Sequence, residues 1–161
     1  AFSPCSLEAT HPDLYWYGIH GVETLYAVMG TGCESVRRTE TTSGVLVTAR
    51  WSDDRQATLW ALSTHGAAYS VTAFGDRKVA SRTGFSGYQG LVREIAQFFE
   101  TRQPPVAREE TTEMFAFMEA VEQSKRRGGV EVGLSTVLTD ATRLAEQKFA
   151  ALEYGGVREG K

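Results

Sequence analysis

An alternation of apolar and polar residues with a period of two dominates the middle of the chain, from about Cys33 to Thr83. Such alternation is typical of half-buried β-strands. Turn residues interrupt it at four places (43–44, 52–54, 65–66 and 75–76). Because such short connections join antiparallel neighbours, the pattern predicts an antiparallel meander of about five strands. Both faces carry bulky side chains, so we expect helices to cover one face and a second sheet or subunit the other.

The segment before these strands is predicted to be a helix over residues 11–29. Thr10 can serve as its N-cap, Asp13 can complete a capping box and Gly30 can end it. Apolar side chains occur nearly all round this helix. That distribution is typical of a helix packed between other elements.

Three further helices are expected toward the C-terminus, according to the apolar spacing and the helix-end residues. One spans 88–99, the next begins near Glu109, and the last spans 139–152 before a flexible tail over 153–161. With 161 residues the chain has the size of one domain. The order helix, strands, helices predicts an α+β domain with a predominantly antiparallel open sheet and helices packed on one face.

The composition excludes several classes of function. The net charge is −3 at pH 7, and no basic stripe is present that could neutralise the phosphates of a nucleic acid. No apolar stretch approaches the ~20 residues of a membrane span. Cys5 and Cys33 fit neither a metal motif nor a disulfide framework, so a reducing, cytoplasmic compartment is expected.

The predicted first helix carries the strongest candidates for chemistry. Trp16, His20, Glu23 and Ala27 are spaced to share one helix face. His20 is the candidate general acid or base, and Glu23 can orient it. A structural His–Glu pair within an internal hydrogen-bond network is the alternative. Two such ligands are too few for a metal ion, so no metal site is predicted.

Glycines and aromatic residues surround this histidine. Gly18 and Gly21 each cost about 1 kcal/mol of helix stability relative to alanine, which indicates the close approach of a strand, a substrate or a cofactor ring, with a strand favoured. The aromatic run at 15–17 would suit a carbohydrate, although such clusters more often belong to a core. The candidate substrate-binding residues are Trp16, Tyr17 and Glu23; no cofactor-binding residue is identified.

Several of these segments, taken in order, resemble the C-terminal domain of the Gfo/Idh/MocA family (glucose–fructose oxidoreductase, inositol dehydrogenase and relatives). The resemblance covers nearly the whole chain and depends on order and spacing more than on any single motif. The segments that carry it are 17–23 (YGIHGVE), 71–76 (VTAFGD), 98–105 (FFETRQPP), the helix from 109 to 124, and 128–130 (GGV).

The resemblance implies the substrate-binding and oligomerisation domain of a nicotinamide-dependent sugar or polyol oxidoreductase. In that family a separate N-terminal Rossmann domain binds NAD or NADP, and one of its lysines meets a catalytic histidine at the substrate. His20 falls on the histidine position. The chain is then expected to be a fragment without the Rossmann domain, inactive and without a dinucleotide on its own, and to form homo-oligomers through its open sheet.

Two positions depart from the family pattern. Trp16 stands where many dehydrogenases of the family have an aspartate, and Glu23 stands for the usual aspartate after the histidine. An alternative function is therefore a stand-alone, non-catalytic module that binds a carbohydrate or assembles through its sheet. A third, a small metal-dependent hydrolase, would need His11, His20 and Glu23 to converge.

Overall fold

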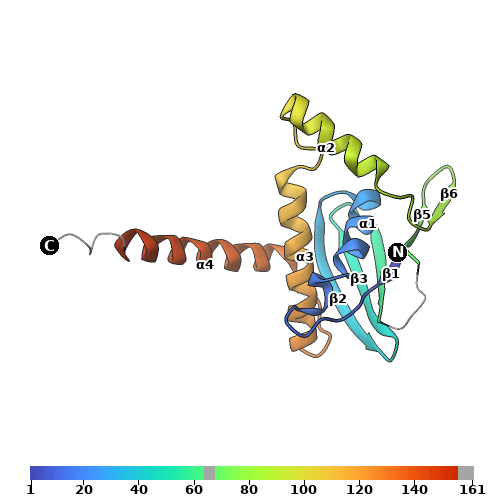
Figure 1. Cartoon of the computed structure of the whole chain (residues 1–161). Helices are drawn as coiled ribbons and strands as arrows, with labels where there is room; N and C mark the ends of the chain where they lie inside the picture. Colours follow the sequence, from blue (N-terminus) through green and yellow to red (C-terminus); the bar gives the residue numbers. More distant parts are fainter. Residues whose placement is uncertain (64–67, 156–161) are drawn as a thin grey trace.

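A seven-stranded sheet in the order β6-β5-β1-β4-β3-β2-β7 organises the chain. The structure is a computed structural model and describes residues 1–63 and 68–155 (Figure 1). All neighbouring strands are antiparallel except β1 and β4, which are parallel. The predicted α+β class with a mostly antiparallel open sheet is therefore confirmed. The elements are β1 (Phe2–Pro4), the 3-10 turn η1 (Asp13–Tyr15), α1 (Ile19–Met29), β2 (Cys33–Thr41), β3 (Gly44–Trp51), β4 (Gln56–Leu62), β5 (Ser70–Phe74), β6 (Val79–Thr83), α2 (Gln89–Thr101), α3 (Arg108–Arg126), β7 (Val132–Gly133) and α4 (Leu134–Gly155).

The predicted strands are present as β2 to β6, but they do not form one continuous meander. β2, β3 and β4 follow one another, and β5 pairs with β6. The short strand β1 lies between β4 and β5, where Phe2 is opposite Trp60 on one side and Ser70 on the other. The predicted turn at 65–66 lies outside the described residues.

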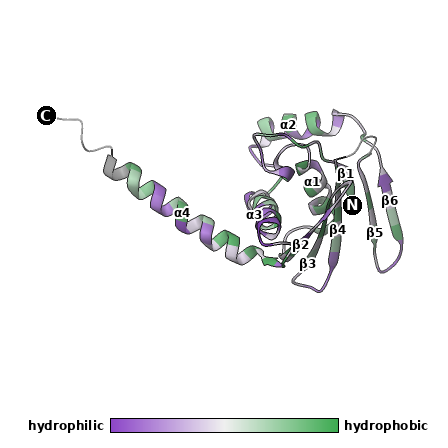
Figure 2. Cartoon of the chain, turned by 90° about the horizontal axis from the view of Figure 1, so that it is seen from below, coloured by the Kyte–Doolittle hydropathy of each residue, from purple (hydrophilic) through white to green (hydrophobic). Residues whose placement is uncertain are grey.

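The core lies between one face of the sheet and the helices α1 and α3, which contact β4 and β2 respectively (Figure 2). Val47, Trp51 and Leu59 point from the sheet into this core and are almost fully buried. The register places Phe2 and Trp60 opposite each other on the other face, where both are exposed. Helices therefore cover one face, as predicted.

The first helix is shorter than predicted. Residues 13–15 form a 3-10 turn, Trp16 has a non-helical backbone (φ −105°, ψ −112°), and α1 begins only at Ile19. The reason is that Asp13 does not complete a capping box, because its carboxylate binds Arg38 and Lys125. The expectation of a sandwiched helix is also wrong for the described chain, because α1 buries one side and exposes the side that carries His20.

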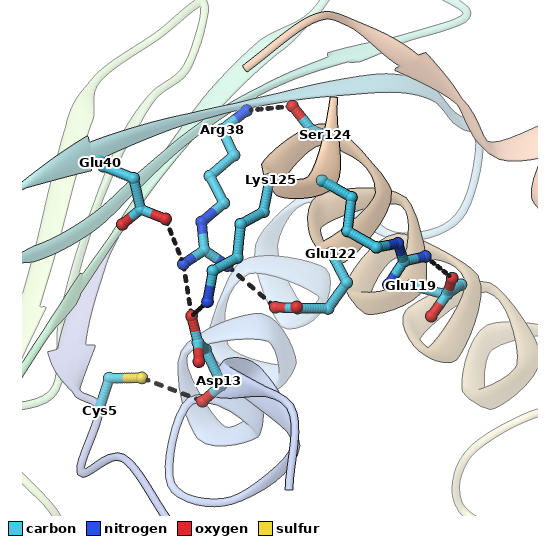
Figure 3. A network of polar contacts seen from close by, with 9 residues as sticks. Cys5, Asp13, Arg38, Glu40, Glu119, Glu122, Ser124 and Lys125 are labelled. Carbon is cyan, nitrogen blue, oxygen red and sulfur yellow. Dashed lines mark hydrogen bonds and ion pairs between the residues drawn. The ribbon is translucent and has the colours of Figure 1, made fainter. Parts of the chain in front are cut away.

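A buried arginine joins the turn η1 to the sheet and to α3 (Figure 3). Arg38 of β2 is only 3% exposed. Its guanidinium contacts Asp13, Glu122 at 2.9 Å and Glu40 at 2.7 Å. Lys125 of α3 approaches Asp13 from the other side at 2.7 Å. Partial burial would raise the pKa of Asp13, but hydrogen bonds from Lys125 and Arg38 outweigh it and hold the pKa below its usual range.

Glu113 joins the other end of α1 to α3. Its carboxylate accepts hydrogen bonds from the backbone N–H groups of Gly32, at 2.9 Å, and Cys33, at 2.8 Å, and from the Tyr26 hydroxyl at 3.1 Å. Tyr26 belongs to the last turn of α1, and Gly32 and Cys33 follow shortly after its C-terminal end. The α1–β2 connection is therefore held by a side chain more than eighty residues away.

The helices α2 and α4 contribute little to this core. The predicted apolar stripe of α2 is present, but none of its residues is buried. α4 leads away from the body of the molecule (Figure 1); its first turns contact the core through Leu134 and Val137, both buried. Because these two residues anchor it, the helix begins earlier than predicted. It ends at Gly155, so the first residues of the predicted flexible tail are helical. The rest of that tail, 156–161, lies outside the described residues. No helix in the described part of the chain has the length and apolarity needed to cross a membrane.

Candidate functional site

An open cavity of about 600 Å³ lies between α1, the β5–β6 hairpin and the loop that leads into α2. Its volume is within the range of about 300–1,000 Å³ typical of small-molecule sites. Its walls carry aromatic, hydroxyl and charged side chains together. The lining residues are Tyr17, His20, Glu23, Thr24, Ala27, Tyr69, Arg82, Gly84, Phe85, Ser86, Gly87 and Tyr88.

Helix α1 brings the predicted catalytic pair to this cavity. Nδ1 of His20 lies 2.9 Å from a carboxylate oxygen of Glu23, one helical turn away, and both side chains are 51% exposed. The carboxylate can only accept, so it binds the Nδ1 hydrogen and leaves Nε2 for a ligand. The pair is therefore not part of an internal hydrogen-bond network, which was the alternative interpretation of this spacing.

Two tyrosines hold the imidazole ring in place. The rings of Tyr17 and Tyr69 each pack edge-to-face against His20, with centroids 6.0 Å away. Partial burial raises the pKa of Tyr69, and the neighbouring Tyr17, Tyr88 and Glu23 raise it further. Tyr69 therefore keeps its proton at neutral pH and can donate a hydrogen bond into the cavity.

The opposite wall comes from β6 and the loop after it. Arg82 donates a hydrogen bond to Ser86 across the loop, and Phe85 packs against Tyr88 with centroids 5.0 Å apart. Gly84 and Gly87 have φ values of +94° and +80°, a conformation that favours glycine. These two glycines let the loop between β6 and α2 turn sharply at the wall of the cavity.

The close approach of strands, as predicted, explains Gly21, whereas Gly18 is packed against the 3-10 turn η1. A Cβ on Gly21 would lie 2.8 Å from Leu59 of β4 and would overlap the Ser3 hydroxyl of β1. A Cβ on Gly18 would lie 2.8 Å from Leu14. Because only glycine fits at Gly21, α1 lies directly on the sheet, and the position of His20 is set by β1 and β4.

The aromatic run 15–17 is divided by the structure. Tyr17 lines the cavity, whereas Tyr15 packs against Phe115 of α3, with centroids 6.1 Å apart. Trp16 is 46% exposed and stacks on His11, with centroids 5.4 Å apart. Of the four predicted site residues, His20, Tyr17 and Glu23 line the cavity and Trp16 lies outside it.

Tyr69, Arg82 and Tyr88 also line the cavity, and none of them was predicted as a site residue. No local spacing relates them to His20, since they are brought to α1 by the order of the strands. The segment 84–90 (GFSGYQG), with its glycines and aromatic residues, carries a partial signal of such a site.

No group of three or more histidine, cysteine or acidic side chains that could hold a metal ion is present among residues 1–63 and 68–155. His11 is paired with Glu8, with Nδ1 2.9 Å from the carboxylate. The convergence of His11, His20 and Glu23 that a metal-dependent hydrolase would need is therefore not found in this part of the chain.

The arrangement supports proton transfer to and from a hydroxyl group. His20 offers an imidazole nitrogen that Glu23 orients, in the manner of a general acid or base. Tyr69 and Arg82 add hydrogen-bond donors, and Tyr17 and Phe85 add apolar ring faces. A small ligand rich in hydroxyl groups matches this combination.

Comparison with known proteins gives a likeness at the level of the fold. No family model matches the chain, and no curated protein matches it. Its fold matches the crystal structure of a protein from Desulfitobacterium hafniense DCB-2, provisionally described as an NADPH-dependent oxidoreductase, with a TM-score of 0.61 and 13% sequence identity. The match covers 78% of this chain and 49% of the other, so the chain spans about half the length of that protein. The chain therefore shares its fold with about half of that protein.

Proposed function

We propose that this chain is the substrate-binding and oligomerisation domain of a nicotinamide-dependent oxidoreductase of the Gfo/Idh/MocA type that acts on a sugar or polyol. The observation that carries the proposal is the His20–Glu23 pair, with a distance of 2.9 Å, at the wall of an open cavity. The fold likeness to a protein described as an oxidoreductase supports it.

His20 is the proposed catalytic residue. In the oxidation of an alcohol, Nε2 accepts the hydroxyl proton, the carbinol hydrogen leaves as hydride, and the C–O bond becomes a carbonyl. NAD or NADP supplies the hydride acceptor. Glu23 accepts the Nδ1 hydrogen and holds the imidazole in the tautomer that leaves Nε2 to accept the proton.

The hydride acceptor would be held by an N-terminal Rossmann domain, the partner that the family resemblance implies. The exposed apolar stripe of α2 supports this arrangement, because exposed apolar patches of this kind mark interaction sites. Tyr88 lies at the start of that stripe and also lines the cavity. A domain docked on α2 would therefore lie next to His20.

Binding of the substrate class can be tested on the chain itself by two-dimensional NMR, with D-glucose, sorbitol and myo-inositol as probes. We expect one of them to shift the amide signals of the cavity residues. His20→Ala and Glu23→Gln should weaken that binding at least tenfold. No shift at the cavity with any of the probes would contradict the proposed substrate class.

Catalysis requires a second test with the Rossmann domain joined to the chain. NAD(P)-dependent turnover is expected to be lost in His20→Ala and to fall in Glu23→Gln, while Trp16→Phe, outside the cavity, serves as the matched control. Retained turnover in His20→Ala would remove His20 from the catalytic role.

A stand-alone carbohydrate-binding module is the second candidate. One observation favours it: aromatic and polar side chains together line the cavity, as in many carbohydrate sites. It predicts sugar binding of unchanged affinity whether or not a dinucleotide-binding domain is joined, and no turnover in either case. The same titration, repeated on the joined protein with NAD or NADP present, distinguishes the two candidates.

A further inference from the structure

An arginine occupies a position of β6 where an apolar side chain is expected. Val71 and Ala73 of β5 are half-buried on the side that contacts α1, whereas Thr72 between them is exposed. The register places Arg82 opposite Val71 and Ala80 opposite Ala73. Because residues directly opposite each other in an antiparallel pair share one face, Arg82 lies on the α1 side of the hairpin, among apolar neighbours.

This position brings the Arg82 guanidinium to the wall of the cavity that His20 also lines. The guanidinium donates a hydrogen bond to the Ser86 hydroxyl. No carboxylate among residues 1–63 and 68–152 lies within ion-pair distance of it. A guanidinium carries several N–H donors in a planar fork, so donors remain for a ligand in the cavity.

The charges around the cavity favour a ligand with a single negative charge. Among the described residues that line it, Arg82 is the one permanent cation and Glu23 the one carboxylate. Glu23 already accepts the Nδ1 hydrogen of His20, at 2.9 Å. A carboxylate matches the guanidinium fork and brings one charge. A phosphate monoester would bring nearly two charges beside Glu23, with one cation to balance them.

We propose that the substrate is a sugar acid, and that Arg82 binds its carboxylate and so selects it over the neutral sugar. This inference rests on the proposed function, since it specifies which sugars the His20 site takes. Tyr69 can donate a hydrogen bond to a hydroxyl group of the same ligand. Phe85 offers a ring face to the apolar face of the sugar.

The place of Arg82 also orients the substrate. His20 belongs to α1, whereas Arg82 belongs to β6 on the opposite wall of the cavity. A sugar whose carboxylate binds Arg82 therefore lies across the cavity and presents a hydroxyl group of its other end to Nε2 of His20. Two fixed contacts at opposite ends hold the reacting hydroxyl in one orientation, which is how positioning of a substrate accelerates a reaction.

Two matched pairs of probes test this proposal in NMR titrations of the chain: D-glucuronate against D-glucose, and D-gluconate against sorbitol. In each pair a carboxylate replaces a CH₂OH group. We expect the acid of at least one pair to bind at least tenfold more tightly than its neutral counterpart, as a hydrogen bond to a charged group gives. The preference should shrink when salt is raised from about 0.05 M to about 0.5 M, because salt screens the attraction.

Arg82→Met keeps most of the aliphatic stem and removes the charge. It should lower the affinity for the acid to that for the neutral probe, and leave the neutral probe unaffected. Arg77→Met, in the turn of the same hairpin and outside the cavity, removes the same charge and is the matched control, so it should keep the preference. Ser86→Ala removes the partner of Arg82 in the loop and should change both affinities by the same factor. If Arg82 only held the loop, Arg82→Met would behave like Ser86→Ala.

Equal affinities for acid and neutral probes, or an unchanged preference in Arg82→Met, would overturn the proposal. Tighter binding of D-glucose 6-phosphate than of both acids would replace the carboxylate by a phosphate and would overturn it as well. Neutral probes that bind at the cavity as tightly as the acids would overturn this inference alone and leave the proposed function standing. No binding by either kind of probe would overturn both.

Discussion

Replacement of Arg38 by methionine should destabilise the chain more than any surface substitution. The guanidinium is paired with three carboxylates, and the methionine keeps most of the aliphatic stem while removing the charge. Glu122 and Asp13 have side-chain exposures of only 9% and 19%, whereas Glu40 is 58% exposed. The first two pairs therefore dominate, because an exposed pair contributes only about 0–1 kcal/mol.

The magnitude follows from what the substitution leaves behind. Asp13 still has Lys125 at 2.7 Å, but Arg38 is the only cation within ion-pair distance of Glu122 among the described residues. Removing one partner of a buried pair costs about 3–5 kcal/mol, because the other charge stays buried without compensation. With a urea dependence of about 2 kcal/mol per molar, the unfolding midpoint should fall by about 2 M.

Urea denaturation followed by tryptophan fluorescence measures this change, and Arg37→Met is the matched control. Arg37 is the preceding residue of β2 and its side chain is exposed, so its replacement should change the free energy of unfolding by no more than about 0.5 kcal/mol. In the double variant Arg38→Met with Glu122→Leu, part of the lost stability should return, because no unpaired carboxylate remains.

The pH dependence provides the refuting result. The pKa of Asp13 is lowered in the folded chain, so its contribution is present above the unfolded carboxyl pKa of about 3.9 and is lost as the pH falls through the folded value. The difference between wild type and Arg38→Met should accordingly be largest at neutral pH and shrink below about pH 4. A difference under 1 kcal/mol at pH 7, or one that grows on acidification, would refute the electrostatic explanation.

Three further predictions concern packing, thiols and assembly. Gly21→Ala should lower the free energy of unfolding by about 1–3 kcal/mol, because β1 and β4 leave no room for a Cβ. A Cβ on Gly90 would meet nothing within 4 Å, so Gly90→Ala should leave that free energy unchanged or raise it. Thermal melts of the two variants measure the difference. Burial raises the pKa of Cys5 to about 11 and that of Cys33 to about 12, so a disulfide reagent at pH 8 should label neither thiol until urea is added; rapid labelling of the native chain would contradict this burial. If homo-oligomers form through the open sheet, Trp60→Glu should shift sedimentation toward the monomer, and an unchanged profile would place the interface elsewhere.

The fold class could be predicted because strand and helix periodicity are local properties of the sequence. The order of the strands could not. β1 has three residues, too few for a period to be recognised, and its place between β4 and β5 is decided by pairing with residues about sixty positions away. The extent of α1 was wrong for a similar reason, since Asp13 has the spacing of a capping-box residue but binds Arg38, 25 positions away.

The same division applies to the candidate site. His20 and Glu23 are one helical turn apart, so their proximity follows from the helix alone. Tyr69 and Arg82 belong to the hairpin that β1 separates from β4, and their approach to His20 depends on that order. Trp16 was placed with His20 on the assumption of an uninterrupted helix, and the turn at 16–18 removes it from the cavity.

Two features of the cavity connect it to the rest of the proposed enzyme. Tyr88 forms part of the cavity wall and directly precedes α2, so whatever covers the α2 stripe also restricts the mouth of the cavity. On the other side, Gly21 brings α1 against β1 and β4, so the sheet positions the helix that carries His20. A domain docked on α2 would exclude solvent from the same imidazole. Substrate affinity should therefore be higher in the protein with the Rossmann domain joined than in this chain alone, and equal affinities would show that no such domain covers α2.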